Sequence, residues 1–339
     1  EIDLVAEALI ESVRVRLRSD VPMSIFLSSG VDSALVAAII TKELQYDIPA
    51  ITVGFPGTNV ADESADAIAI ARHLGLDHKV VQSDGLAGAT GENAIDLIAS
   101  VYGCAIDNTT VIPALEISTL ARDSATVAIS GIGGDELFYG YNRYQLFYDY
   151  RKLTSLGGSF RKIARLLLQI NRRKTGSDLL RRSSRWTYAN FKNVGVLDIL
   201  DRLPGMTDWG TNQFDNFTSP EYIASRQFDL TEVLPGSFIP AIERSSMRVG
   251  LEVRTPFLNK RLLSVVNSLD QRSLVSFGQK NIGRRLLRRY LPDNLMVGRK
   301  LGFISPIDPL VSSSNTMPLI PGISCEILQA AFARRFTGK

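Results

Sequence analysis

A short apolar strand that turns directly into a helix around small residues is the feature that most constrains this chain. The apolar run from Met23 to Leu27 is followed by Ser28-Ser29-Gly30 and a helix-like run from Ala34 to Leu44. A helix start offers backbone N–H groups and a partial positive charge, and Gly30 lets an anion approach the backbone closely. With Asp32 available to hold Mg²⁺, the turn predicts a phosphate site. Taken alone, the same residues fit a plain helix N-cap equally well.

A second segment repeats this order roughly a hundred residues later. Thr126 to Ser130 forms another short apolar run, and a glycine-rich turn with Asp135 and Glu136 follows it. Two parallel strands whose carboxyl ends each carry such a turn meet at the switch point of a doubly wound sheet. The sequence therefore predicts that Asp32 and Asp135 share one metal ion.

Strand-like and helix-like runs alternate through the first half of the chain, which indicates an α/β fold with a doubly wound, mostly parallel, Rossmann-like sheet. We expect an ATP-binding α/β region over residues 1–150 and a mainly helical region over 151–339 that completes the acceptor site. The active site would lie between the two. The strands are expected at Met23 to Leu27, Ala50 to Gly54, His78 to Gln82 and Thr126 to Ser130, and the helices at Leu4 to Leu17, Ala34 to Leu44, Glu63 to Leu74, Asn93 to Val101 and Ile112 to Arg122.

Four ordered motifs resemble the synthetase domain of class B, glutamine-dependent asparagine synthetases, in the ATP-pyrophosphatase (PP-loop) group. Ser28 to Ser33 is similar to the first motif of that family, Ser-Gly-Gly-x-Asp-Ser, and Gly131 to Tyr141 to the second, Gly-x-Gly-Gly-Asp-Glu-x-Phe-x-Gly-Tyr. Ser246-Met247 followed by Glu252 to Asn259 resembles the third, and Arg299 to Phe303 with Pro306 the closing element. The resemblance covers most of the chain and implies an adenine nucleotide alpha hydrolase-like fold.

The resemblance also implies chemistry. Such an enzyme joins a carboxylate, aspartate in the family, to AMP with release of pyrophosphate, and then transfers ammonia to give the amide. ATP and Mg²⁺ are the implied cofactors, with Asp32 and Asp135 as metal ligands and Lys300 as the lysine that neutralises the phosphorus centre. The implied ATP and pyrophosphate contacts are Leu27, Ser28, Ser29, Gly30, Asp32, Ser33, Val53, Ser130 and Gly131.

The acceptor pocket is less closely defined. Asp107, Glu136, Glu252 and Arg254 are candidates for binding the acceptor. Asp107 fits a loop cap equally well, and Glu252 and Arg254 fit equally a pair with each other beneath the site. For Val53, burial in an apolar core explains the residue as well as a contact with the adenosine does.

Three residues depart from the family pattern. Ile132 stands where asparagine synthetases usually carry Asp or Glu, and isoleucine cannot assist proton transfer or orient the acceptor. Asn259 replaces an acid of unknown purpose, and Ser29 replaces a glycine. We expect the activation step to survive, whereas Ile132 weakens the assignment of aspartate as the acceptor.

Composition limits the class of protein. With 339 residues, 45% hydrophobic and 22% charged, the composition is ordinary for a soluble globular protein, and no apolar run approaches the roughly 20 residues that cross a bilayer. We predict a cytoplasmic enzyme whose partners are ATP, a carboxylate and ammonia. The chain begins without Met, so we expect a fragment that lacks the family's glutaminase domain, which a separate domain or subunit would supply, and we expect no glutamine hydrolysis.

Residues 151–192 carry twelve Lys or Arg against one acid, Asp178. Some relatives in the group modify transfer RNA, but the net charge is only +3 and no aromatic stacking pattern interleaves. A solvated helical face is therefore favoured over a nucleic-acid site.

The sequence is compatible with three functions. The first is an asparagine synthetase-type amide synthetase, and the second uses the same adenylation on another acceptor or amine, such as a sugar, a peptide or a β-lactam-type ring closure. The third is a nucleotide-binding module without turnover, which predicts ATP binding without pyrophosphate release.

Overall fold

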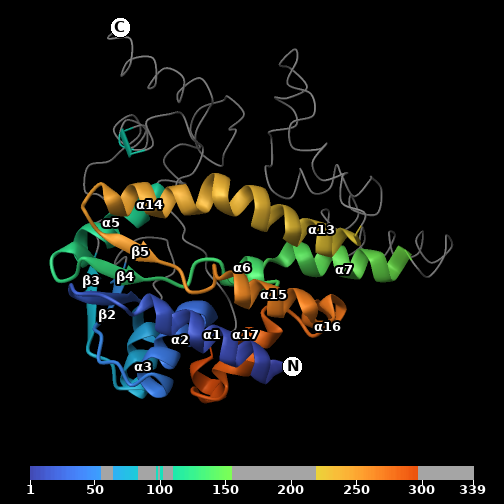
Figure 1. The fold of residues 1–339 in the computed structure, drawn as a ribbon, viewed down its shortest axis with the longest axis horizontal. Helices are drawn as coiled ribbons and strands as arrows, with labels where there is room; N and C mark the ends of the chain where they lie inside the picture. Colours follow the sequence, from blue (N-terminus) through green and yellow to red (C-terminus); the bar gives the residue numbers. More distant parts are fainter. Residues whose placement is uncertain (55–63, 83–96, 98–99, 102–109, 155–218, 297–339) are drawn as a thin grey trace, which may run out of the picture.

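The computed structural model describes the chain except for residues 55–63, 83–96, 98–99, 102–109, 155–218 and 297–339. In this part of the chain one parallel five-stranded sheet has the order β3-β2-β1-β4-β5 (Figure 1). The strands are β1 (Met23–Phe26), β2 (Ala50–Gly54), β3 (His78–Gln82), β4 (Val127–Ile129) and β5 (Glu252–Arg254).

The strand order places a switch point between β1 and β4. The chain moves outward from β1 through β2 to β3, and then returns to the other side of β1 for β4 and β5. Ile25 of β1 is in register with both Ala50 and Ile129. The carboxyl ends of β1 and β4 therefore lie side by side, where ligands bind in doubly wound sheets.

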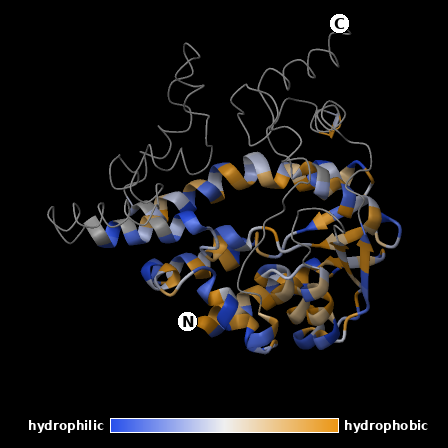
Figure 2. Ribbon diagram, turned by 180° about the vertical axis from the view of Figure 1, so that it is seen from behind, coloured by the Kyte–Doolittle hydropathy of each residue, from blue (hydrophilic) through white to orange (hydrophobic). Residues whose placement is uncertain are grey.

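Alternate residues of the strands supply two separate hydrophobic clusters. Phe26 and Ala128 belong to a cluster with α5 (Val111–Arg122) and α14 (Ile239–Met247), whereas Ile25 and Ile129 join the larger cluster on the other face. Both faces of the sheet are thus covered, as the near-continuous apolar strands require. The strands are coloured mainly as hydrophobic in Figure 2.

The helices on the larger cluster come from both ends of the described chain. Helix α17 packs on α2 and α15 packs on α1, so the last described helices lie against the first ones. They are α1 (Ile2–Arg16), α2 (Val31–Ala38) continued by the π-helical η1 (Ile39–Glu43), α3 (Ser64–Leu74), α15 (Lys260–Ser268), α17 (Asn281–Leu287) and the short η3 (Asp293–Leu295).

The remaining helices form a layer beyond the carboxyl edge of the sheet. α13 packs on α7, α16 packs on α7 and α17, and η2 packs on α14 (Figure 1). They are α6 (Gly134–Leu137), α7 (Asn142–Thr154), α13 (Glu221–Phe228), the π-helical η2 (Asp229–Phe238) and α16 (Gln271–Ser276).

The predicted α/β fold with a doubly wound parallel sheet is confirmed, and each of the four predicted strands forms. Of the predicted helices, the one at 93–101 lies mostly outside the described residues. The structure adds an edge strand that was not predicted, β5 at residues 252–254, within the region expected to be mainly helical. Only Val253 of this strand is apolar, so periodicity did not mark it.

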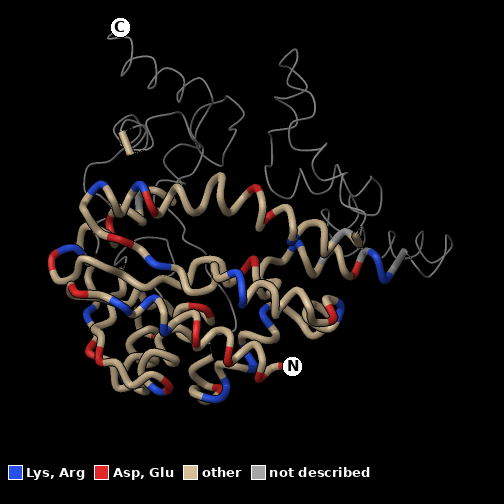
Figure 3. The backbone as a smooth tube through the Cα atoms, in the orientation of Figure 1, with Lys and Arg blue, Asp and Glu red and all other residues tan. Residues whose placement is uncertain are grey.

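Charges of both signs are scattered over the described backbone rather than segregated on one face (Figure 3). Most of the basic 151–192 segment lies outside the described residues. Within them, no helix combines the length and apolar character needed to cross a membrane.

Candidate active site

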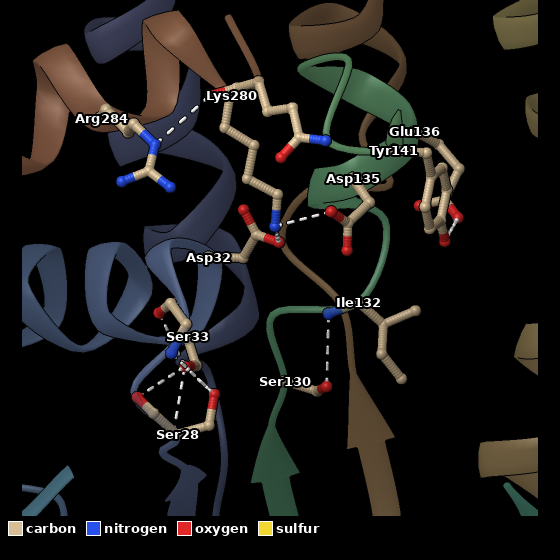
Figure 4. Close-up of polar contacts among 12 residues, drawn as sticks. Ser28, Asp32, Ser33, Ser130, Ile132, Asp135, Glu136, Tyr141, Lys280 and Arg284 are labelled. Atoms are coloured by element: carbon tan, nitrogen blue, oxygen red, sulfur yellow. Dashed lines mark hydrogen bonds and ion pairs between the residues drawn. The ribbon is translucent and has the colours of Figure 1, made fainter. Parts of the chain in front are cut away.

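The turn after β1 is held by the hydroxyl groups of its two terminal serines. Ser33 Oγ accepts a hydrogen bond from the Ser28 backbone N–H at 3.1 Å and lies 2.9 Å from Ser28 Oγ. Ser28 Oγ in turn accepts from the Gly30 N–H at 3.2 Å. These bonds fix the path from Leu27 into α2, so that the helix N-terminus faces the switch point (Figure 4).

The turn after β4 lies directly against the first turn. A Cβ atom on Gly131 would stand 2.7 Å from the backbone nitrogen of Ser33, and one on Gly134 would collide with the Asp32 carboxylate. Gly133 has a φ of 92°, and its added Cβ would lie 2.6 Å from Leu258. Glycine is therefore required at positions 131 and 134 because the two turns touch, and at position 133 because of its positive φ and the close approach of Leu258. Ser130 Oγ accepts from the Ile132 N–H at 3.4 Å and braces the bend.

One lysine joins the two turns. Lys280 Nζ contacts Asp32 Oδ2 and lies 2.7 Å from Asp135 Oδ1, and only 5% of Lys280 is exposed (Figure 4). Burial by itself lowers the pKa of Lys280, but the two carboxylates outweigh it and raise that pKa to about 12. The ammonium is therefore charged, and both buried carboxylates share it.

The loop between α16 and α17 presents Lys280 in a left-handed conformation, with φ at 53°, immediately before α17. Gly140 packs closely over the ion pair, because a Cβ there would collide with Asp135 Oδ1 and Lys280 Cε. The cation is thus enclosed by α2, α6 and α17.

The two carboxylates fit a divalent cation. Asp32 and Asp135 already hold one cation between them, and carboxylate oxygens are the ligands that Mg²⁺ prefers. Among the described residues no group of three or more His, Cys, Asp or Glu comes together, so a metal ion bound here would draw further ligands from phosphate oxygens or water.

Glu136 lies beside this ion pair on α6 and is 2% exposed. Tyr141 Oη donates to Glu136 Oε1 at 2.6 Å. Burial raises the pKa of Glu136 to about 7, although the Tyr141 hydrogen bond opposes the shift.

The profile of a family described as asparagine synthase matches residues 4–315, which is most of the chain. The chain belongs to the asparagine synthase family.

Relatives in this family include a putative glutamine-hydrolysing asparagine synthetase of Mycobacterium tuberculosis, 29% identical over 90% of this chain and 48% of that protein. Asparagine synthetase 1 of Bacillus subtilis is 26% identical over 89% of the chain and 49% of its own length. An amidase of Gibberella zeae is 32% identical over 42% of the chain and 23% of the amidase. The chain thus spans about half the length of the asparagine synthetases it matches.

Most of the nucleotide-site residues predicted from the sequence meet at the switch point. Leu27 to Ser33 follow β1, Ser130 and Gly131 follow β4, and Val53 is in β2 beside β1. Val53 and Ile132 are partly buried and pack against the cluster formed with α5 and α14. In Figure 4 the Ile132 side chain points away from the serine turn, on the side where Glu136 and Tyr141 lie.

Glu252 and Arg254 pair with each other, which was one of the two interpretations left open for them. Arg254 Nε lies 2.6 Å from Glu252 Oε1, and Arg254 Nη1 donates to the carbonyls of Arg16 at 2.8 Å and Arg18 at 2.7 Å. Asp107 and Lys300 lie outside the described residues.

Sequence reasoning missed Lys280. The only local signal is a lysine between Gly278-Gln279 and the helical run that begins at Asn281. Nothing in that segment marks the lysine as buried, because both of its carboxylate partners come from distant parts of the chain.

Proposed function

We propose that this chain adenylates a carboxylate with ATP and then forms an amide from the acyl adenylate. The observation that carries the proposal is the convergence of Asp32, Asp135 and the charged Lys280 at the carboxyl ends of β1 and β4. Anionic and cationic groups in this arrangement suit a bound cation and a triphosphate. Membership of the asparagine synthase family supports it.

In the first step, an oxygen of the acceptor carboxylate attacks the α-phosphorus and pyrophosphate leaves. Ser28, Ser29, Gly30 and Ser33 would bind the pyrophosphate at the start of α2, with Leu27, Val53, Ser130 and Gly131 beside the adenosine. Asp32 and Asp135 would hold Mg²⁺, which neutralises phosphate charge when bound.

Lys300 was expected to neutralise the phosphorus centre, but it lies outside the described residues. Lys280 is a described lysine that would take this role. As a charged and nearly fully buried ammonium, it would face the phosphate oxygens in a site where charge is poorly screened. Lys300 stays a prediction beside it, as does Asp107 in the acceptor pocket.

In the second step, ammonia attacks the acyl carbon, loses a proton and displaces AMP. Aspartate is the proposed acceptor and asparagine the product, because relatives that match about nine tenths of the chain are asparagine synthetases. Ammonia would come from a glutaminase domain or subunit, and we place the reaction in the cytoplasm. Glu136 is the proposed acceptor-binding residue among the described candidates, because Glu252 and Arg254 pair with each other.

A second candidate is the same adenylation with another acceptor or amine. It is favoured by Ile132, which cannot accept a proton, and by the similarity to an amidase over 42% of the chain.

The test is pyrophosphate and AMP release from magnesium-ATP and ammonium, with and without L-aspartate, while the product is identified by mass. Aspartate-dependent AMP together with asparagine would establish the first candidate. AMP formed only with other carboxylates would favour the second. No pyrophosphate under any condition would refute both and leave a binding module.

A further inference from the structure

Arg226 of α13 is the largest fully buried side chain in the described part of the molecule, with 2% of its surface exposed. Arginine is almost never buried so completely without a specific reason. Its described hydrogen bonds go to backbone carbonyls and side-chain amide oxygens rather than to carboxylates. The buried guanidinium therefore holds these carbonyl and amide groups in place rather than pairing with an acid.

One edge of the guanidinium binds the turn that carries Asp135. Arg226 Nε donates to the carbonyls of Glu136 at 2.9 Å and Leu137 at 3.2 Å. The carbonyl of Asp135 itself accepts from the Gly140 N–H at 2.7 Å. Within α6 the Gly134 carbonyl accepts from the Phe138 N–H at 2.9 Å, whereas the carbonyls of Glu136 and Leu137 accept from Arg226 at the end of this short helix.

The opposite side of Arg226 reaches the helices that precede Lys280. Nη1 donates to Asn267 Oδ1 at 2.8 Å in α15 and lies 3.5 Å from Gln271 Oε1 in α16. Gln271 Oε1 also accepts from Tyr139 Oη at 2.9 Å. The guanidinium lies 5.2 Å from the ring of Tyr139, whose φ of 56° belongs to the left-handed region.

We propose that Arg226 is a positioning residue for the metal-binding carboxylate of Asp135, joining α6 to the helices that lead to Lys280. The inference rests on the proposed function, since it assumes that Asp135 binds the metal ion. Arg226 lies in the helical layer, so this layer would control the geometry of a site built on the sheet.

Lysine cannot replace arginine in this role. The planar guanidinium directs donors toward the α6 carbonyls and toward Asn267 at the same time, whereas an ammonium is a compact point charge. Arg226→Lys keeps the positive charge but loses the planar set of N–H donors, and Arg226→Gln loses both. Arg16→Gln is the control, because Arg16, although only partly buried, likewise donates to a backbone carbonyl, that of Leu258, at 2.8 Å.

The experiment uses the full chain and Mn²⁺ as the metal probe. Mn²⁺ binding is measured by electron paramagnetic resonance with a non-hydrolysable ATP analogue present. Affinity for the analogue without metal is measured separately in EDTA, and denaturant unfolding shows whether each variant is folded. We expect both Arg226 variants to bind Mn²⁺ at least tenfold more weakly, with metal-free nucleotide affinity within twofold of wild type. Arg16→Gln should match wild type in both.

Several results would overturn the inference. These are Mn²⁺ affinity within twofold of wild type in both Arg226 variants, an equal loss of metal and nucleotide affinity, or a wild-type chain that binds no Mn²⁺. If Arg226→Gln does not fold, the Mn²⁺ affinity of Arg226→Lys alone tests the inference. If the expected Mn²⁺ pattern appears but no carboxylate supports pyrophosphate release, the proposed function fails while the role of Arg226 stands.

Discussion

At the scale of single residues, Lys280 holds together two carboxylates that would otherwise repel each other in a buried site. Lys280→Met should lower pyrophosphate release at least a hundredfold, because the phosphate loses its protein cation. It should also lower the free energy of unfolding of the metal-free protein by roughly 3 kcal/mol, since the Asp32 and Asp135 charges stay buried without it. Pyrophosphate assays and denaturant titrations measure the two effects. Lys42→Met, at an exposed lysine, is the control, and wild-type turnover in the Lys280 variant would contradict the assignment.

Gly140 offers a steric test of the same ion pair. The added methyl group of Gly140→Ala would occupy the space of Asp135 Oδ1 and Lys280 Cε, so we expect pyrophosphate release to fall more than tenfold. Overpacking of this kind costs about 1–3 kcal/mol of stability. Gly236→Ala is matched to it, because an added Cβ there meets no atom within 4 Å. Equal activity in the two variants would argue against a closely packed ion pair.

Glu136 makes stability depend on pH. The pKa of Glu136 is about 7 in the folded protein against an ordinary 4.5, so its contribution is complete below pH 4.5 and is lost as the pH rises through 7. Relative to Glu136→Gln, the magnesium-free wild type should lose roughly 3 kcal/mol of unfolding free energy over that range. Urea titrations at successive pH values measure the difference. The exposed Glu7→Gln should run parallel to wild type, and a parallel Glu136→Gln curve would contradict the prediction.

At the scale of elements, α15 explains a departure from the family pattern. Asn259, where the family usually has an acid, is the N-cap of α15, and its Oδ1 accepts from the N–H groups of Arg261 at 2.9 Å and Leu262 at 3.3 Å. Asparagine and aspartate serve this purpose about equally. The replacement therefore preserves the start of the helix.

A cap of this kind is open to a direct stability test. Asn259→Ala should lower the free energy of unfolding by about 1 kcal/mol, while Asn259→Asp should change it by less than half of that. Thermal and urea unfolding measure both variants, and pyrophosphate release should stay near wild type in each. A large loss of activity with Asn259→Asp would point to a role beyond capping.

At the scale of the whole molecule, sequence patterns predicted the strands and turns that depend on neighbouring residues. Ala50–Gly54 and His78–Gln82 form strands over the predicted residues, and the turns at Ser28 and Gly131 meet as the switch-point argument required. β5 has a single apolar residue and pairs with a strand far earlier in the chain, so no local pattern marks it.

The same limit applies to the site. Asp32 and Asp135 were found because each follows an apolar strand and a small-residue turn. Lys280 and Arg226 carry no such local signal, because their burial and their partners depend on helices that pack from distant parts of the chain. Long-range packing therefore decides which basic residues enter the site.

The origin of Lys280 also has a consequence for biosynthesis. Asp32 leaves the ribosome 248 residues ahead of the lysine that neutralises it. While the nascent chain is being made, β1, β2 and β4 can pair, but the two carboxylates at their ends cannot be buried against Lys280. The strand ends therefore stay hydrated until α17 arrives, and the candidate site is completed only after α17 has been translated.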